Sequence, residues 1–295
     1  MVTACRRSCI DSLCGMPSTS ALLPGFDDDL DRLVGPVQGT VSVWLGGLDG
    51  VPRSGRDEAA VHYAASTMKL PLVLAAYRLH EAGRLDLDEP VEVHNRFASG
   101  IDGSPFSLDQ DDDQDDDTWA LLGRTCPLRR LAEHAIVRSG NLATNLLLGR
   151  VGADAVAAVL ADARCSAATV LPRGIGDFAA HEAGLDNLVT AADLARVLAG
   201  IGHRTLAAAP TCAAVEQVLT RQEHRAGVPA GLPAGTEVAN KTGWITGVSH
   251  DVALVRPTDA PAYVLAVLTS TDLAEEQGSA LIARISAAAW EVRTA

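Results

Sequence analysis

Lysine is almost absent from this chain of 295 residues. Of its 24 lysine and arginine side chains, only Lys69 and Lys241 are lysines. Arginine keeps its proton near neutral pH, whereas a buried lysine can lose it, so the two side chains are not interchangeable in a catalytic site. These two positions are therefore the first candidates for chemistry.

Net positive charge and long apolar runs are also lacking. The formal net charge is -13, and no local cluster of basic residues stands out, which argues against a nucleic-acid partner. No run of 18 apolar residues occurs, and residues 1–25 hold no apolar core of the kind that a signal peptide needs. We expect no membrane segment and a cytoplasmic location.

Cysteine is present but not in the pairs that bind zinc. None of the six cysteines forms a C-x-x-C motif, and three of them fall within residues 1–25, which we expect to be a disordered tail with reduced thiols. We expect no metal site and no cofactor. With 47% hydrophobic and 21% charged residues, the rest of the chain can bury a large core.

Strand signals open and close the chain, and helical signals fill its middle. Residues 39–50 and 58–66 are predicted to form a hairpin, because β-branched and aromatic residues surround a glycine-rich turn. Strands are predicted again at residues 235–244, 249–257 and 262–270. Apolar spacing of three and four residues predicts helices at residues 27–35, 69–83, 128–152, 154–163, 190–201 and 280–293. This order predicts an antiparallel sheet with an inserted helical block.

One segment does not fit the helical block. Seven aspartates fall within the nine positions 109–117. Such dense like charge predicts a solvated loop over residues 108–118. Calcium binding is the alternative, although the glycine and glutamate that an EF-hand loop needs are not in place.

The stretch S-T-M-K places Ser66 three residues before Lys69. If a helix begins here, the hydroxyl and the amine lie on one face within reach of each other. Serine needs a neighbouring base to act as a nucleophile, and a desolvated lysine beside another cation can accept its proton. Taken alone, the tetrapeptide also fits a helix N-terminus that is capped by serine.

Two further motifs follow in the chain. An S-G-N motif begins at Ser139, at the head of an apolar helix, and a K-T-G motif begins at Lys241, on a late strand. With S-T-M-K, in this order, they resemble the penicillin-recognising serine hydrolases, most closely class A β-lactamases and their low-molecular-weight penicillin-binding relatives. The resemblance covers residues 26–295, and the stretches 69–91 and 139–152 agree with the helices that follow the first two motifs.

The resemblance implies the fold and its division into domains. The fold class is α+β, an α/β sandwich plus an all-α subdomain, with a five-stranded antiparallel sheet flanked by the N- and C-terminal helices. Residues 26–63 and 205–295 would form the α/β subdomain, and residues 64–204 would form the helical one. The active site would lie between the two subdomains.

The resemblance also implies a role for each motif residue. Ser66 would attack a carbonyl to form an acyl-enzyme, and Lys69 would accept its proton. Ser139 would pass a proton to the leaving group, and Lys241 would set the field around Ser139 and attract a substrate carboxylate. Backbone N–H groups of Ser66 and Trp244 would form the oxyanion hole. The substrate-binding residues would be Asn141, Thr242, Gly243 and Trp244.

Three departures from the family pattern stand out. Gly140 occupies the middle of the motif where the family has aspartate. His250 stands where class A enzymes commonly place an arginine that grips the substrate carboxylate; it could donate a hydrogen bond there or simply pack on its strand. The glutamate that activates water for deacylation is missing near residues 173–176, and only Asp177 and Glu182 could substitute for it if the loop takes a different path.

Three functions follow from these observations. The first is a serine hydrolase that acylates Ser66 with esters, amides or β-lactams and is weak as a β-lactamase. The second is a genuine β-lactamase with a displaced base, and the third is a non-hydrolytic protein that binds an acylating ligand. The intact serines and lysines favour an enzyme. We expect a monomer whose substrate is a small molecule with a carboxylate.

Overall fold

The computed structural model describes residues 23–295, which form helices around a central five-stranded antiparallel sheet. The strand order is β2-β1-β11-β10-β9, so N-terminal and C-terminal strands lie side by side. In the register, Gly39 pairs with Thr271 and Val248 with Ile245. The strands are β1 (Gly39–Gly47), β2 (Pro52–Arg56), β9 (Glu237–Ile245), β10 (Val248–Arg256) and β11 (Tyr263–Thr271). The predicted fold class is confirmed.

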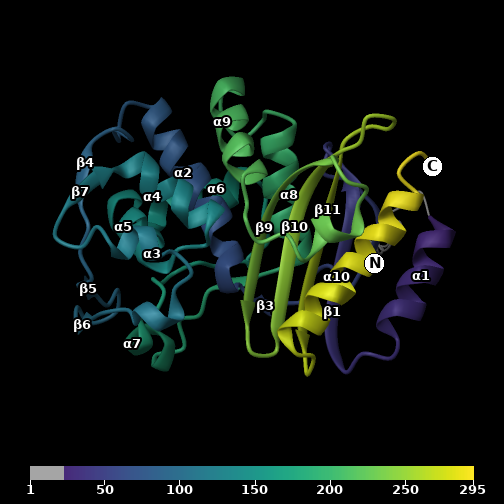
Figure 1. The fold of residues 1–295 in the computed structure, drawn as a ribbon, viewed down its shortest axis with the longest axis horizontal. Helices are drawn as coiled ribbons and strands as arrows, with labels where there is room; N and C mark the ends of the chain where they lie inside the picture. The colour runs from purple at the N-terminus through teal and green to yellow at the C-terminus, as the bar shows by residue number, and fades with distance from the viewer. Residues whose placement is uncertain (1–22) are drawn as a thin grey trace, which may run out of the picture.

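Both faces of this sheet are covered, which explains why β10 and β11 are buried along almost their whole length. On one face α1 (Pro24–Val34) and α10 (Glu275–Glu291) lie next to each other, in purple and yellow in Figure 1. Phe26 and Ile285 from these helices pack with Val43 and Leu265 of the sheet. This face forms a core of its own.

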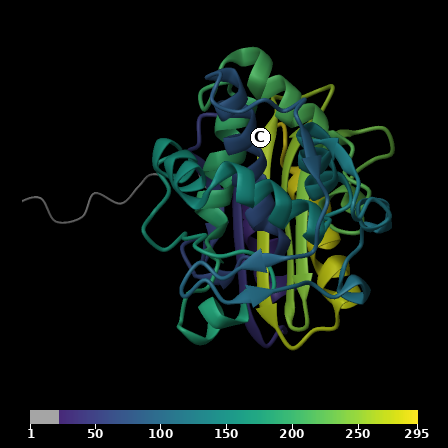
Figure 2. The ribbon, with the colours of Figure 1, turned by 90° about the vertical axis from the view of Figure 1, so that its left-hand side faces the viewer.

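The helical block covers the other face and holds the larger core. Its helix α8 (Ala191–Gly202) packs directly on β1, β10 and β11, and it begins where the Thr190 hydroxyl accepts the backbone N–H of Asp193 at 3.1 Å. The view in Figure 2, turned by 90°, has this block in front of the strands. The other helices of at least eight residues are α2 (Lys69–Glu81), α4 (Leu128–Val137), α5 (Asn141–Val151), α6 (Ala153–Asp162) and α9 (Ala209–Thr220).

Shorter elements connect these helices. The short helices are η1 (Ala65–Met68), η2 (Gln110–Asp112), α3 (Asp116–Trp119), α7 (Phe178–Glu182) and η3 (Val228–Gly231). Three two-stranded sheets pair β3 (His62–Tyr63) with β8 (Leu188–Val189), β4 (Pro90–Glu92) with β7 (Thr125–Pro127), and β5 (Phe97–Ala98) with β6 (Pro105–Phe106).

The predicted hairpin is wrong in its second strand. The partner of β1 is β2, and residues 58–66 contribute only the short strand β3, which pairs with β8 outside the main sheet. A tight turn with Gly50 at φ 74° brings the chain back earlier than predicted, and Asp57 at φ 46° then ends the pairing. Ser66 therefore lies on η1 instead of a strand.

The prediction of a solvated loop at residues 108–118 is also wrong for part of its length. Asp115 is fully buried, and Asp113 is half-buried. Asp113 accepts a backbone N–H group at the start of α5, and Asp115 contacts His134 and Arg138 beside α4, so hydrogen bonds and the arginine charge compensate for their burial. The remaining aspartates of the segment are exposed.

Two further expectations concern the N-terminal tail and membrane-spanning segments. The predicted tail, residues 1–25, lies outside the described residues except for its end, where Pro24 begins α1. Within residues 23–295, no single helix meets the length and hydropathy that a membrane span requires; only α5 and α6 counted together meet it, and the chain bends by 86° between them.

Candidate active site

The Ser66 hydroxyl and the Lys69 amine lie beside each other where η1 passes into α2. The Nζ atom of Lys69 is 2.9 Å from Oγ of Ser66, and the lysine side chain is completely buried. Ala65, immediately before the serine, has φ 44°, a conformation that is costly for a residue with a β-carbon. The surrounding packing therefore holds the serine in one defined place.

Ser139 lies between the two lysines. Its Oγ atom is 3.3 Å from Nζ of Lys69 and 3.0 Å from Nζ of Lys241, and its carbonyl accepts a further hydrogen bond from Lys69 at 2.5 Å. Like Ala65, Ser139 has a positive φ, 60°. The network of Ser66, Lys69, Ser139 and Lys241 comes from three separate stretches of sequence, so the fold assembles the predicted constellation.

Burial controls the charge of both lysines. It lowers the pKa of Lys69 to about 7, although the carboxylates of Asp113 and Asp115 act in the opposite direction. Burial also lowers the pKa of Lys241 well below its usual value, and the positive charge of Lys69 adds to that effect. Near neutral pH a substantial share of Lys69 is therefore a free amine, which can accept the proton of Ser66.

Asn141 fixes Lys69 from the opposite side. Its Oδ1 atom accepts a hydrogen bond from Nζ of Lys69 at 2.8 Å, and its Nδ2 atom donates to the Asp112 carbonyl at 2.9 Å. A carbonyl oxygen can only accept, so this contact sets the orientation of the amide.

Gly243 lets β9 approach the nucleophile closely. A β-carbon at this position would lie 2.9 Å from the backbone nitrogen of Ser66 and 3.0 Å from that of Thr67. Only glycine fits without displacing the backbone. The next residue, Trp244, lines the same cleft as Ser66, as the predicted oxyanion hole requires. The buried Thr242 hydroxyl has no hydrogen-bond partner among the described residues.

His250 has both ring nitrogens occupied by backbone groups. Nδ1 accepts the N–H of Thr269 at 3.1 Å, and Nε2 lies 2.9 Å from the Tyr63 carbonyl, to which it donates. Burial lowers its pKa to about 4. The ring also meets His62 edge to face, with centroids 5.6 Å apart. Its surroundings are those of a neutral histidine packed on its strand, and a contact with a substrate carboxylate stays a prediction.

Neither of the two carboxylates considered for deacylation lines the cleft at Ser66. Glu182 is exposed at the end of α7. Asp177 is buried and caps the same helix, accepting the N–H of Ala180 at 3.1 Å and that of Gly100 at 3.0 Å.

The cleft itself has a volume of about 880 Å³ and contains residues that the sequence interpretation missed. On the loop side, Ile175 is held by Asn145, four residues after Asn141 on α5. That spacing places both asparagines on one helix face and could have indicated a second polar contact with the site. Other unpredicted lining residues include Tyr63, Arg173, Phe178 and His181, together with Asp109, Asp111 and Asp112 of the acidic segment.

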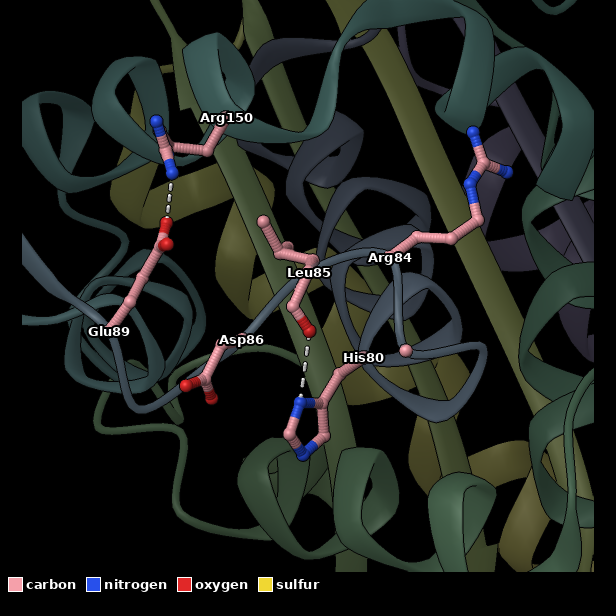
Figure 3. Close-up of a pocket in the computed structure, with 7 residues that line it drawn as sticks. His80, Arg84, Leu85, Asp86, Glu89 and Arg150 are labelled. Atoms are coloured by element: carbon pink, nitrogen blue, oxygen red, sulfur yellow. Dashed lines mark hydrogen bonds and ion pairs between the residues drawn. The ribbon is translucent and has the colours of Figure 1, made fainter.

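The chain has other surface hollows, one of which is drawn in Figure 3. There Arg150 pairs with Glu89, and the His80 ring contacts the Leu85 carbonyl at 3.1 Å. No residue of the three motifs lines it. Among residues 23–295, no group of three or more histidine, cysteine, aspartate or glutamate side chains is arranged to hold a metal ion.

Comparison with known proteins gives consistent matches. The model of the Beta-lactamase enzyme family matches residues 25–292. A β-lactamase from Sphaerobacter thermophilus is similar in structure, with a TM-score of 0.76 and 25% identity over 91% of this chain and 97% of that chain. PBP-A has a TM-score of 0.76 and 22% identity, with coverages of 92% and 96%. A β-lactamase from Xanthomonas campestris has a TM-score of 0.77 and 18% identity, with coverages of 91% and 96%. The search of curated proteins returned no match.

Proposed function

The chain belongs to the β-lactamase enzyme family, a family of serine hydrolases, and from this premise we propose that it forms an acyl-enzyme on Ser66 with esters, amides or β-lactams. The observation that carries the proposal is the contact of 2.9 Å between Ser66 Oγ and Lys69 Nζ, in a site where burial lowers the pKa of the lysine to about 7. A nucleophile and its base are thus within hydrogen-bonding distance at the pH where the base is available.

Acylation uses the groups around Ser66. Its oxygen attacks the substrate carbonyl while its proton passes to Nζ of Lys69, and the negative charge on the carbonyl oxygen is stabilised by the N–H groups of Ser66 and Trp244. The bond to the leaving group then breaks, and Ser139 hands that group its proton while taking the proton from Lys69, whose Nζ lies 3.3 Å from Ser139 Oγ. The hydrogen bond from Lys241 to Ser139 Oγ, 3.0 Å long, supports this relay.

Deacylation has less support in the cleft. The loop residue that Asn145 holds there is Ile175, whose side chain cannot accept a proton from water. General-base assistance contributes about 10²–10⁴ in rate. We propose that β-lactam adducts on Ser66 hydrolyse slowly, whereas small esters leave room for water and let Lys69 act in both steps.

A genuine β-lactamase is the second candidate function. It is favoured by Asp109, Asp111 and Asp112 of the acidic segment, which line the same cleft as Ser66. One of them could hold a water molecule for deacylation. Slow turnover is expected because, among the described residues, no carboxylate of the loop around Ile175 lines the cleft, so the turnover number decides between the two functions.

The proposal also covers the substrate, the oligomeric state and the cellular location. The buried, unpartnered Thr242 hydroxyl and the neighbouring Lys241 support a small-molecule substrate that carries a carboxylate. A solved complex of a PBP-A variant is an acyl-enzyme with penicillin G, which supports testing penicillins first. We further propose that the protein acts as a monomer in the cytoplasm.

The experiment is covalent labelling followed by mass measurement. The protein and its Ser66→Ala variant are each mixed with a panel of penicillins, cephalosporins and p-nitrophenyl esters, and the intact masses are recorded. We expect one acyl group on the native chain, mapped to Ser66 by peptide analysis, and none on the variant. Labelling of both chains, or of neither by any compound, would contradict the proposed function.

A further inference from the structure

The acidic segment, residues 109–117, is built into the head of helix α5. The Asp113 carboxylate accepts the backbone N–H groups of Asn141 and Leu142, each at 2.8 Å, and also the indole N–H of Trp119 at 2.8 Å. These are the first N–H groups of α5, which have no partner within their own helix. A negative charge at a helix N-terminus is favourable, so Asp113 acts as a capping residue from a distant part of the sequence.

The same segment orients the Asn141 side chain. The Asp112 carbonyl accepts the amide Nδ2 at 2.9 Å, which leaves Oδ1 facing Lys69 at 2.8 Å. A displacement of the acidic segment would therefore move the acceptor that holds the general base. The chain of contacts runs from the segment through Asn141 to Lys69.

A third contact explains the departure at Gly140. A β-carbon on Gly140 would lie 2.8 Å from both Cβ and Oδ2 of Asp115, so the aspartate side chain fills the space next to the glycine. Asp115 is fully buried, and its Oδ2 atom contacts His134 Nδ1 at 2.9 Å. Its second oxygen lies 3.6 Å from a nitrogen of Arg138. Asp115 thus places a carboxylate directly beside position 140, where the family motif has its own aspartate.

We propose that Asp113 and Asp115 are positioning residues of the acylation site, which replace, from the acidic segment, the carboxylate that Gly140 does not supply. The expected effects on acylation rate rest on the proposed function, whereas the placement of the two carboxylates beside α5 does not. The role of these two aspartates in the acidic segment is then to align Ser139, Asn141 and Lys69.

The charges around Lys69 make the proposal measurable. Asp113 and Asp115 lie near it in the acidic segment, and their negative charge favours its protonated form. Lys241 on β9 and His224 after α9 are positive when protonated and disfavour that form. Removal of the Asp113 charge should therefore lower the pKa of Lys69 further. A purely structural role would not predict this direction.

The first experiment follows the lysines by NMR, since the chain contains only Lys69 and Lys241. Protein labelled with ¹³C at lysine Cε gives two signals, and the Lys69→Arg variant shows which of them belongs to Lys69. The native chain and the variants Asp113→Asn and Asp116→Asn are then titrated with pH. Asp116 is an exposed member of the same segment, so Asp116→Asn is matched in charge. We expect the Lys69 midpoint to move to lower pH in Asp113→Asn and to stay in place in Asp116→Asn. An unchanged midpoint in Asp113→Asn, or equal movement in both variants, would overturn the proposal.

The second experiment exchanges the two partners Gly140 and Asp115. Gly140→Asp and Asp115→Gly are each expected to slow acylation by roughly 10- to 100-fold, because small misplacements of reacting groups are costly. The double variant restores one carboxylate at the same place and should recover much of that loss. Additive losses in the double variant would contradict the replacement.

These outcomes separate the inference from the function on which it rests. If the native chain is not acylated at all, the proposed function fails, and the lysine titration still decides the placement of Asp113. If the native chain is acylated and Asp113→Asn behaves like Asp116→Asn in both rate and titration, only the inference fails.

Discussion

Asn145 clasps the backbone of Ile175, accepting its N–H at 2.9 Å and donating to its carbonyl at 2.8 Å. The clasp fixes an apolar side chain on the loop side of the cleft that also contains Ser66. Asn145 is buried on α5, one turn beyond Asn141. Its hydrogen bonds therefore fix the position of the loop at Ile175 relative to α5. If the proposed function holds, the rate of deacylation should therefore depend on which side chain stands at this loop position.

Replacement of that side chain should supply the missing base. Ile175→Glu is expected to raise the rate of β-lactam deacylation by about 10²–10⁴, because a carboxylate could there activate water. Ile175→Gln is the matched control, with nearly the same shape and no basic oxygen, and should change the rate little. The measurement is the decay of a preformed penicillin adduct; equal decay in the two variants would mean that the loop position does not face the ester.

Acylation should follow the ionisation of Lys69. Burial lowers the pKa of this lysine to about 7, so the acylation rate with an activated ester should rise with pH and reach half its plateau near that value. Lys69→Arg keeps the charge but cannot accept a proton, and its rate should fall by more than tenfold. A loss smaller than tenfold, equivalent to less than about 1.4 kcal/mol in the barrier, would show that another group is the base.

The sequence predicts the main constellation because its motifs are local and its helices strongly periodic. Ser66 and Lys69 are neighbours in the chain, and Lys241 lies within a strand that its pattern predicts. Ser139 lies two residues before α5, at a break in the stretch 128–152 that its apolar spacing predicts as one helix. Four of the five strands of the sheet lie in stretches that the patterns predict, whereas β2 does not, and the five-stranded sheet as a whole is what the family resemblance implies. The motifs and the four strands depend on short-range spacing, which a single sequence reveals.

Long-range contacts explain what the sequence does not reveal. The burial of Asp115 depends on His134, and the space it fills depends on the absence of a side chain at Gly140. Composition alone predicts that such an aspartate faces water. The hairpin error has a similar cause, since residues 62 and 63 pair with β8, more than 120 residues further along the chain, instead of with β1.

The acidic segment should contribute to stability as well as alignment. Replacement of residues 109–117 by a Gly/Ser linker is expected to lower the free energy of unfolding by at least about 2 kcal/mol, because α5 loses its cap and the Asp115 partners are left unpaired. Exchange of only Asp111 and Asp116 for serine should cost little, since both are exposed. Urea unfolding compares the two changes, and equal midpoints would show that the segment is a solvated loop after all.

His250 should make the fold sensitive to acid. The folded state keeps its imidazole neutral down to about pH 4, whereas the unfolded chain binds that proton at about pH 6.5. The unfolded state therefore binds more protons between these values, and stability is lost as the pH falls through them, on the order of 3 kcal/mol from this residue.

Comparison with a variant isolates the contribution of His250. Asp251, whose pKa burial raises to about 6, acts in the opposite direction over a similar range, so the native curve alone does not separate the two. Urea unfolding of the native chain and of His250→Gln at several values between pH 4 and 7 should give curves that diverge towards acid. Parallel curves would mean that the histidine is already charged in the folded protein.

The most direct measurement of the central claim is the lifetime of a penicillin adduct on Ser66. The protein is mixed with excess penicillin G, quenched at times from milliseconds to hours, and its intact mass and the hydrolysed penicillin are quantified together. We predict that the adduct accumulates to nearly one per chain and persists for minutes or longer, with correspondingly slow hydrolysis. Steady-state turnover above about 10 s⁻¹, the median for enzymes generally, would contradict the account, as would a chain that never carries the adduct.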